Sequence, residues 1–136
     1  MLSVDTSVRN VTVGADPEVF VADMSGTITS AIGKVGGSKD YPRPVMDGGV
    51  QEDNVLAEFN INPAKSKLEF VCNISSVMGS LRNILENNNL QPVIVPSHKF
   101  TAQELSSFGP EAMEFGCSSE WNAWDSKKMP RPKGDK

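Results

Sequence analysis

Acidic side chains alternate with apolar ones in two segments of the chain, and this pattern is typical of β-strands that have one polar face. The first segment contains Asp16 and Glu18, and the second, residues 52–61, contains Glu58 and Asn60. Residues i and i+2 of a strand point to the same face. The sequence therefore places the two members of each pair side by side.

Two such strands brought together would form an oxygen-rich patch, which suits a hard divalent cation such as magnesium. Unpaired carboxylates are costly to desolvate, so their presence on a half-buried strand favours a functional explanation. A plainer explanation stays open for each pair. Asp16 and Glu18 would then belong to an exposed strand edge or to a turn at Pro17. Glu58 and Asn60 would belong to a solvated outer face of the sheet.

The pattern of the whole chain predicts an α+β fold, an antiparallel sheet with helices packed on one face. Strands are expected at residues 10–13, 19–23, 27–32, 55–62 and 93–95, with a hairpin turn at residues 24–26. A long helix is expected at residues 67–86, where Ser66 and Glu69 fit a capping box. Its expected buried stripe consists of Leu68, Val71, Met78, Leu81 and Leu85. Thr101 and Glu104 suggest a second capping box at the start of a short helix.

The length of 136 residues predicts one domain, and the net charge of -4 argues against nucleic acid or an anionic membrane as the main partner. The first residues, Met1 to Asp5, lack the basic segment and apolar core of a signal peptide, which predicts a cytoplasmic protein. Cys72 and Cys117 are expected to be buried thiols.

A glycine-rich loop at residues 33–40 could cradle phosphate through its backbone N–H groups, with Lys34 or Lys39 nearby. Its residue order differs from that of a Walker A loop, so a flexible hairpin connection is the favoured explanation. The single histidine, His98, is expected to lie in a surface loop. The tail at residues 125–136 is rich in lysine and proline and predicts disorder.

Several motifs in this order resemble the type 2 phage COOH-NH2 ligases, a family in the carboxylate-amine ligase group that shares the glutamine synthetase catalytic fold. The motifs are Gly-Ala-Asp-Pro-Glu-Val-Phe at 14–20, Gly-Gly-Ser-Lys at 36–39, the segments 51–55 and 58–64, Phe-Gly-Cys at 115–117 and Asn-Ala-Trp at 122–124. The resemblance spans residues 13–124, nearly the whole chain.

The resemblance implies an enzyme that uses ATP to phosphorylate a carboxylate, which an amine then attacks to give an amide. It assigns Mg2+ or Mn2+ to carboxylates on adjacent strands, here Asp16, Glu18, Asp53 and Glu58. Metal-bound oxygens neutralise charge on a transferred phosphoryl group, which explains why carboxylates suit this role. Asn60 and Lys39 match positions that would contact substrate or nucleotide.

Two departures from the family pattern change what the resemblance implies. Ser118 and Ser119 stand where the family usually has an Asp-Pro-like pair. The family also continues into a segment with an arginine, paired glycines and a His-x-His-like strand. Residues 1–124 therefore resemble the N-terminal half of the catalytic domain, with residues 125–136 as a disordered tail.

This reading predicts a partner: a second chain that supplies the rest of the site, or another copy joined through an exposed sheet edge. The expected location is the cytoplasm of an infected bacterial host. Two other functions stay open. The chain could be a non-catalytic relic that binds a ligand or protein, or a structural or assembly protein of a phage.

Overall fold

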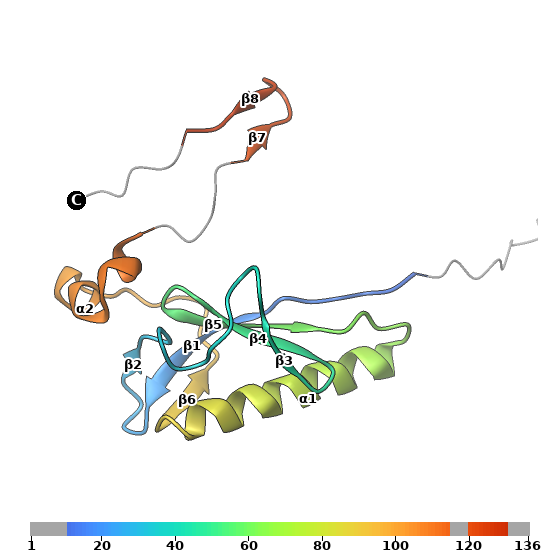
Figure 1. The fold of residues 1–136 in the computed structure, drawn as a ribbon, viewed down its shortest axis with the longest axis horizontal. Coiled ribbons are helices and arrows are strands. Elements are labelled where there is room, and N and C mark those ends of the chain that lie inside the picture. Colours follow the sequence, from blue (N-terminus) through green and yellow to red (C-terminus); the bar gives the residue numbers. More distant parts are fainter. Residues whose placement is uncertain (1–10, 115–119, 131–136) are drawn as a thin grey trace, which may run out of the picture.

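The computed structural model describes residues 11–114 and 120–130 and has an antiparallel sheet at its centre (Figure 1). Its strands are β1 (Glu18–Asp23), β2 (Ile28–Thr29), β3 (Arg43–Val45), β4 (Gly48–Asp53), β5 (Leu56–Ile61) and β6 (Leu90–Val93). The strand order is β2-β1-β5-β4-β3, and β6 pairs with β1. Every pair is antiparallel, which confirms the predicted α+β class with an antiparallel sheet.

The turn between β1 and β2 is organised by one carboxylate. Asp23 accepts hydrogen bonds from the backbone N–H and the hydroxyl of Ser25 and from the backbone N–H of Thr27. Gly26 takes the positive φ of 89° that the turn requires. The predicted hairpin is therefore confirmed, although β2 is shorter than the expected 27–32.

The helix α1 (Lys67–Glu86) crosses one face of the sheet (Figure 1) and has the predicted bounds. The Ser66 hydroxyl accepts from the N–H of Glu69, and the Glu69 carboxylate accepts from the N–H of Lys65. The core lies between α1 and the sheet. Its buried members include Val19, Val21, Val50, Ala57, Phe59, Ile61, Val77, Leu81 and Leu85.

The predicted buried stripe of α1 is correct at Leu81 and Leu85 and wrong at its beginning. Leu68 and Val71 are 74% and 53% exposed. The residues that face the sheet repeat every four positions from Asn73 onward, and Leu68 and Val71 lie on a neighbouring stripe. Cys72 is also exposed, contrary to the expectation of a buried thiol, and Cys117 lies outside the described residues.

The second helix, α2 (Ala102–Phe108), begins with the predicted capping box of Thr101 and Glu104 and is followed by the short helix η1 (Pro110–Met113).

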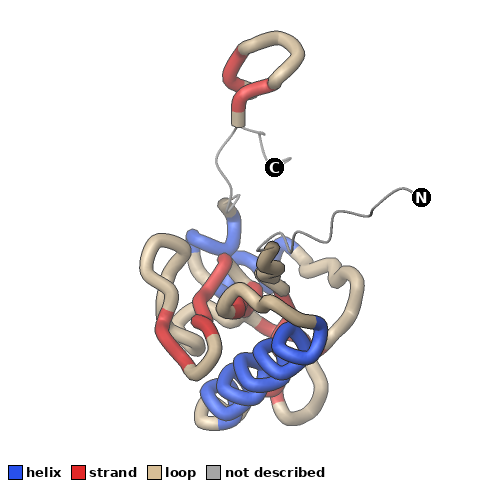
Figure 2. The backbone as a smooth tube through the Cα atoms, turned by 90° about the vertical axis from the view of Figure 1, so that its right-hand side faces the viewer, coloured by secondary structure: helices blue, strands red, loops and turns tan. Residues whose placement is uncertain are grey.

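The prediction that α1 and α2 pack on one face of the sheet is wrong. Phe20 points away from the α1 side, because it alternates with the core residues of β1. The centre of the Phe20 ring lies 6.4 Å from the centre of the Phe100 ring. The Phe100 ring centre lies 5.4 Å from that of Phe108 in α2. Figure 2 shows the two helices well apart, with α1 at the bottom of the view.

The strand expected at 93–95 lies earlier, at Leu90–Val93, because a tight turn after α1 ends at Asn89 with a positive φ of 55°. Of the strand expected at 10–13, residues 11–13 contribute a bridge between Val13 and Ala64, and residue 10 lies outside the described residues. In the described residues, no helix has the length and apolar character needed to cross a membrane.

A small hairpin of β7 (Trp121–Asn122) and β8 (Lys127–Lys128) spans the predicted boundary at residue 124. The Asn122 side chain accepts from the N–H groups of Trp124 and Asp125 and thereby forms the turn. Met129 donates to the carbonyl of Glu120. Paired backbone thus extends beyond the predicted start of the disordered tail, and residues 131–136 lie outside the described residues.

Candidate metal centre

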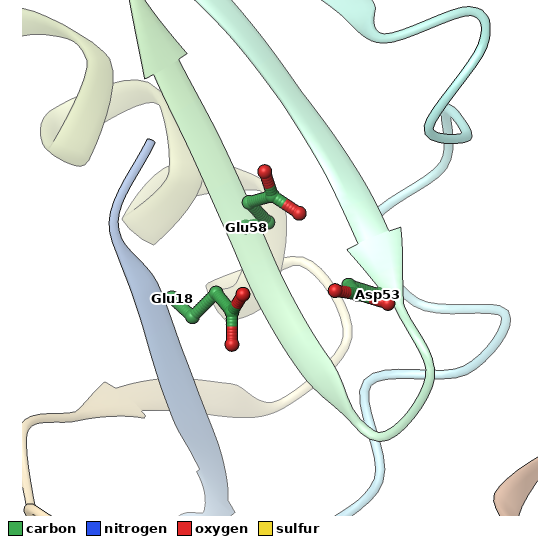
Figure 3. Close-up of side chains that lie close together, drawn as sticks. All are labelled: Glu18, Asp53 and Glu58. Atoms are coloured by element: carbon green, nitrogen blue, oxygen red, sulfur yellow. The ribbon is translucent and has the colours of Figure 1, made fainter. Parts of the chain in front are cut away.

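Three of the four predicted metal-binding carboxylates come together on the face of the sheet opposite α1. Glu18 in β1, Asp53 at the end of β4 and Glu58 in β5 each offer an oxygen, and these oxygens all lie within 4.8 Å of one another. Figure 3 shows the three side chains directed toward a common space. We call these residues the carboxylate cluster.

The strand register explains why the cluster forms. Glu58 lies between two partners, with Glu18 opposite it on β1 and Gln51 opposite it on β4. Asp53 follows Gln51 by two residues and so points to the same face. Directly opposed side chains on paired strands have their Cβ atoms about 4.5–5.5 Å apart, and diagonal ones about 7–8 Å. Both distances are within reach of glutamate and aspartate side chains.

Gln51 is a residue of the site that sequence reasoning missed. Its side chain is buried, and its Nε2 donates a 2.9 Å hydrogen bond to Oε2 of Glu58. The signal was present in the sequence, since Gln51 precedes Asp53 by two residues on a strand and must share its face. Gln51 fixes the position of one Glu58 oxygen and leaves the other available to a ligand.

The environment of Glu58 disfavours its charge. Burial is the main reason that the pKa of Glu58 is raised. The hydrogen bond from Gln51 lowers this pKa, and the negative charges of Asp53, Glu18 and Asp16 raise it further, in that order. A carboxylate with a raised pKa beside other acids costs stability when it is ionised. A bound cation would remove this cost.

We expect Glu58→Gln to stabilise the protein at pH 7, by a few tenths to about 1 kcal/mol because the group is partly exposed. The pKa of Glu58 is higher in the folded chain than its ordinary value of 4.5, so the folded chain holds this proton more tightly than the unfolded chain does. Stability therefore rises as pH falls through the raised pKa, and the glutamine variant should lose this component. Thermal unfolding of both proteins from pH 4 to pH 8 measures the difference.

Glu104→Gln is a control that should change the stability at pH 7 in the opposite direction. The N–H and hydroxyl of Thr101 hold the pKa of Glu104 below its ordinary range, so this carboxylate stabilises the fold above its unfolded pKa. Its replacement should lower the melting temperature at pH 7. A melting temperature of Glu58→Gln below that of the natural protein at pH 7 would contradict the electrostatic account of the cluster.

Asp16 and Asn60 share the face of the cluster but lie outside it. The carbonyls of Ala15 and Pro17 accept from β5 on either side of Asn60, so Asp16 lies opposite Asn60. Asp16 is exposed and does not belong to the group of converging carboxylates. The Asn60 side chain lies over Gly49, where an added Cβ would be 3.2 Å from its Oδ1.

The glycine-rich loop does not present its backbone to the cluster. The Glu52 carboxylate accepts from the N–H groups of Gly33, Val35 and Gly36 at 2.9, 3.1 and 2.9 Å. The chain's own carboxylate thus occupies the donors that would have cradled phosphate in the less favoured explanation of this loop. Lys39 is exposed in this loop.

An aromatic group lies beside the cluster. Phe20 follows Glu18 by two residues on β1 and points to the same face. The His98 ring lies 6.0 Å from that of Phe20 and 4.6 Å from that of Phe100. His98 is exposed, in agreement with the prediction of a surface residue.

An open pocket of about 390 Å³ lies elsewhere, at the start of α1, where Val13, Ala64 and Phe70 are among its lining residues. It does not include the carboxylates, and the cluster rather than this pocket has the chemistry of a metal site. No protein-family model, curated protein or solved structure matches the chain.

Proposed function

We propose that the carboxylate cluster binds Mg2+ or Mn2+ and that the chain forms the metal-binding part of an ATP-dependent carboxylate-amine ligase. The observation that carries the metal proposal is the convergence of Glu18, Asp53 and Glu58 from three strands. Oxygen-only ligands are those that these cations prefer. The ligase activity rests on the sequence resemblance.

The arrangement of charges supports a binding role. Like charges directly opposite one another in a sheet are destabilising, yet Glu18 and Glu58 occupy directly opposed positions. Local arrangements that cost stability are characteristic of functional sites. The buried Gln51 holds Glu58 within this arrangement instead of allowing it to turn away.

The residues would divide the work as follows. Glu18, Asp53 and Glu58 would hold the cation, which when bound neutralises negative charge on the phosphate groups of ATP. Phe20 and Phe100 offer apolar ring surface on the same side, against which a nucleotide base could stack. Asn60 lies opposite Asp16 on β5, and both would extend the polar surface on which the second substrate would bind.

Manganese should bind saturably to the isolated chain, with a dissociation constant of about 0.1–1 mM because the cluster supplies only three ligand side chains. Paramagnetic broadening of NMR signals should centre on Glu18, Asp53 and Glu58. Glu18→Gln and Glu58→Gln should each weaken binding by about tenfold or more, since each removes one anionic ligand. Asp16→Asn should have a smaller effect, because Asp16 lies outside the cluster.

Glu86→Gln is the control for the loss of a negative charge, since Glu86 is exposed at the end of α1. It should leave manganese binding unchanged. Equal effects of Glu86→Gln and Glu58→Gln would reduce the binding to general attraction by an acidic protein. No broadening at millimolar manganese would leave the cluster as a solvated acidic face.

The ligase proposal has its own test. ATP should bind more tightly with Mg2+ than without it, and Phe100→Ala should weaken nucleotide binding while leaving manganese binding intact. Amine-dependent release of ADP, in the presence of a second chain that completes the site, would establish the reaction. Metal and nucleotide binding without turnover of any acid and amine pair would favour a non-catalytic binding role.

A further inference from the structure

The segment that leads into β1 is paired on one edge only. Val13 and Ala64 exchange two backbone hydrogen bonds of 2.9 Å, and the carbonyl of Pro17 accepts from the N–H of Phe59 at 3.0 Å. The odd-numbered residues of this segment therefore direct their backbone groups toward β5 and the chain that follows it.

Backbone groups alternate in direction along a strand, so Thr12, Gly14 and Asp16 direct theirs to the opposite edge. β6 occupies that edge only from Phe20 onward, where Phe20 pairs with Val93. Within the part of the chain that the structure describes, no strand pairs with this edge at residues 12–16. We call it the open edge. An unpaired row of N–H and C=O groups is a template for another strand.

Proline does not protect the open edge against pairing, and Asp16 is the one charged side chain at residues 11–17. Pro17 does not block it, because the position of its missing N–H faces β5, on the paired side. The far edge of the sheet differs, since β3 has only 3 residues and contains Pro44. Short strands and prolines are devices that prevent edge pairing. The sheet is therefore protected at β3 and accessible at the open edge.

Apolar surface lies along the open edge. Val11 and Val13 are 64% and 53% exposed on the α1 side of the sheet. Ser76 reaches the carbonyl of Met46 in the turn between β3 and β4. Ser76 therefore marks the flank of α1 that lies near β3 and β4. Val71 lies about 140° around the helix from Ser76, on the opposite flank, which faces the open edge. A strand added at this edge would cover part of this apolar surface.

We propose that the open edge pairs with the same edge of a second copy of this chain, antiparallel and about a two-fold axis at Gly14. This register places Thr12 opposite Asp16 of the other copy, where the hydroxyl can donate to the carboxylate. It also places Val13 opposite Ala15, so that apolar side chains meet on the α1 side. The edge is thus complementary to itself, as a two-fold interface requires.

Charge disfavours a register with its two-fold axis at Asp16. A two-fold axis moved to Asp16 would place the two Asp16 side chains directly opposite each other, and like charges in that position are destabilising. The axis at Gly14 separates them and leaves the least bulky residue at the centre. Gly14 has open space where a Cβ would stand.

The dimer should be weak. A pairing confined to residues 11–17 covers less surface than the roughly 1,200–2,000 Å² of stable interfaces. We expect a transient dimer that forms at high micromolar concentration. The proposal does not depend on metal binding, because no residue of the carboxylate cluster is required for the pairing.

Amide hydrogen exchange measured by NMR at low and high protein concentration tests the proposal residue by residue. Val13 should be protected at both concentrations, because its N–H is bonded to Ala64. Thr12, Gly14 and Asp16 should gain protection only at high concentration. Sedimentation equilibrium should show the dimer over the same range of concentration.

Gly14→Pro should abolish the dimer, because it removes the N–H at the axis. Gly14→Ala is the matched control and should retain it, since the added methyl group meets open space. Thr12→Pro provides a second disruption if Gly14→Pro fails to fold. A chain that is monomeric at about 1 mM would overturn the proposal. Protection of the even-numbered amides at every concentration, or a dimer that persists in both folded proline variants, would also overturn it.

Discussion

Leu81→Ala should lower the free energy of unfolding by about 2–5 kcal/mol, the range for leucine truncations in packed cores. Leu81 is fully buried and lies in the core cluster with Val21, Phe59 and Val77. The loss combines the transfer free energy of the removed atoms with the cavity that remains, since the surrounding strands relax only partially. Urea unfolding monitored by circular dichroism measures the change.

Leu68→Ala is the matched control for Leu81→Ala. Both substitutions remove the same atoms from the same helix, but Leu68 is 74% exposed. Its truncation should change the free energy of unfolding by less than about 0.5 kcal/mol, as is usual for surface positions. Similar losses for the two variants would mean that α1 contacts the sheet through a different face.

The long helix shows what local pattern can and cannot predict. Its bounds depend on the Ser66 cap and on the apolar repeat, both of which are local, and the prediction of residues 67–86 is confirmed. The buried face depends on which stripe meets the sheet. Leu68 and Val71 are as apolar as Val77 and Leu81, so periodicity alone does not distinguish the two stripes. The contact with the sheet decides, and it is a tertiary property.

The candidate site was predictable to a similar extent. Alternation along a strand placed Glu58 with Asn60 on one face, and the structure agrees. Convergence requires the register between strands, which depends on the turn at residues 54–55 and on the core face of β1. Register places Glu18 rather than Asp16 opposite Glu58. This is why three of the four predicted carboxylates converge and Asp16 does not.

The position of α2 depends on contacts between distant segments. The capping box at Thr101 fixes where the helix begins, but nothing local indicates the face of the sheet that it approaches. The aromatic contacts of Phe100 with Phe20 and Phe108 decide this. Phe20 alternates with core residues, so its exposure on the other face was implied by the sequence, but the aromatic rings that cover it were not.

The sequence favoured a flexible connection for the glycine-rich loop and left open that its backbone N–H groups cradle phosphate. The structure gives three of these N–H groups a different acceptor, the Glu52 carboxylate. Glu52 alternates with Gln51 and Asp53 and therefore points to the other side of β4, where the loop lies. Val35 is buried in the core beside the Glu52 carboxylate, and the Arg43 side chain donates a hydrogen bond to the backbone carbonyl of Val35. The loop is thus part of the packed structure rather than a flexible connection.

Glu52→Ala should lower the free energy of unfolding by about 2–3 kcal/mol. It removes three hydrogen bonds to a charged acceptor, each worth about 1.5–3 kcal/mol alone, and water can replace those at the exposed Gly33 and Gly36. The amides of Gly33, Val35 and Gly36 should exchange faster than in the natural protein. Urea unfolding and amide exchange measure the two effects.

Two further variants separate the loop from the carboxylate cluster. Glu52→Gln keeps one oxygen acceptor and should give a smaller loss of stability than Glu52→Ala. Asp53→Asn changes the neighbouring residue on the opposite face, and it should weaken manganese binding while leaving the loop amides protected. Inorganic phosphate should leave the loop amide shifts of the natural protein unchanged, because Glu52 already occupies these donors. A saturable phosphate shift at Gly33 and Gly36 in the natural protein would restore the loop as an anion site and contradict its structural role.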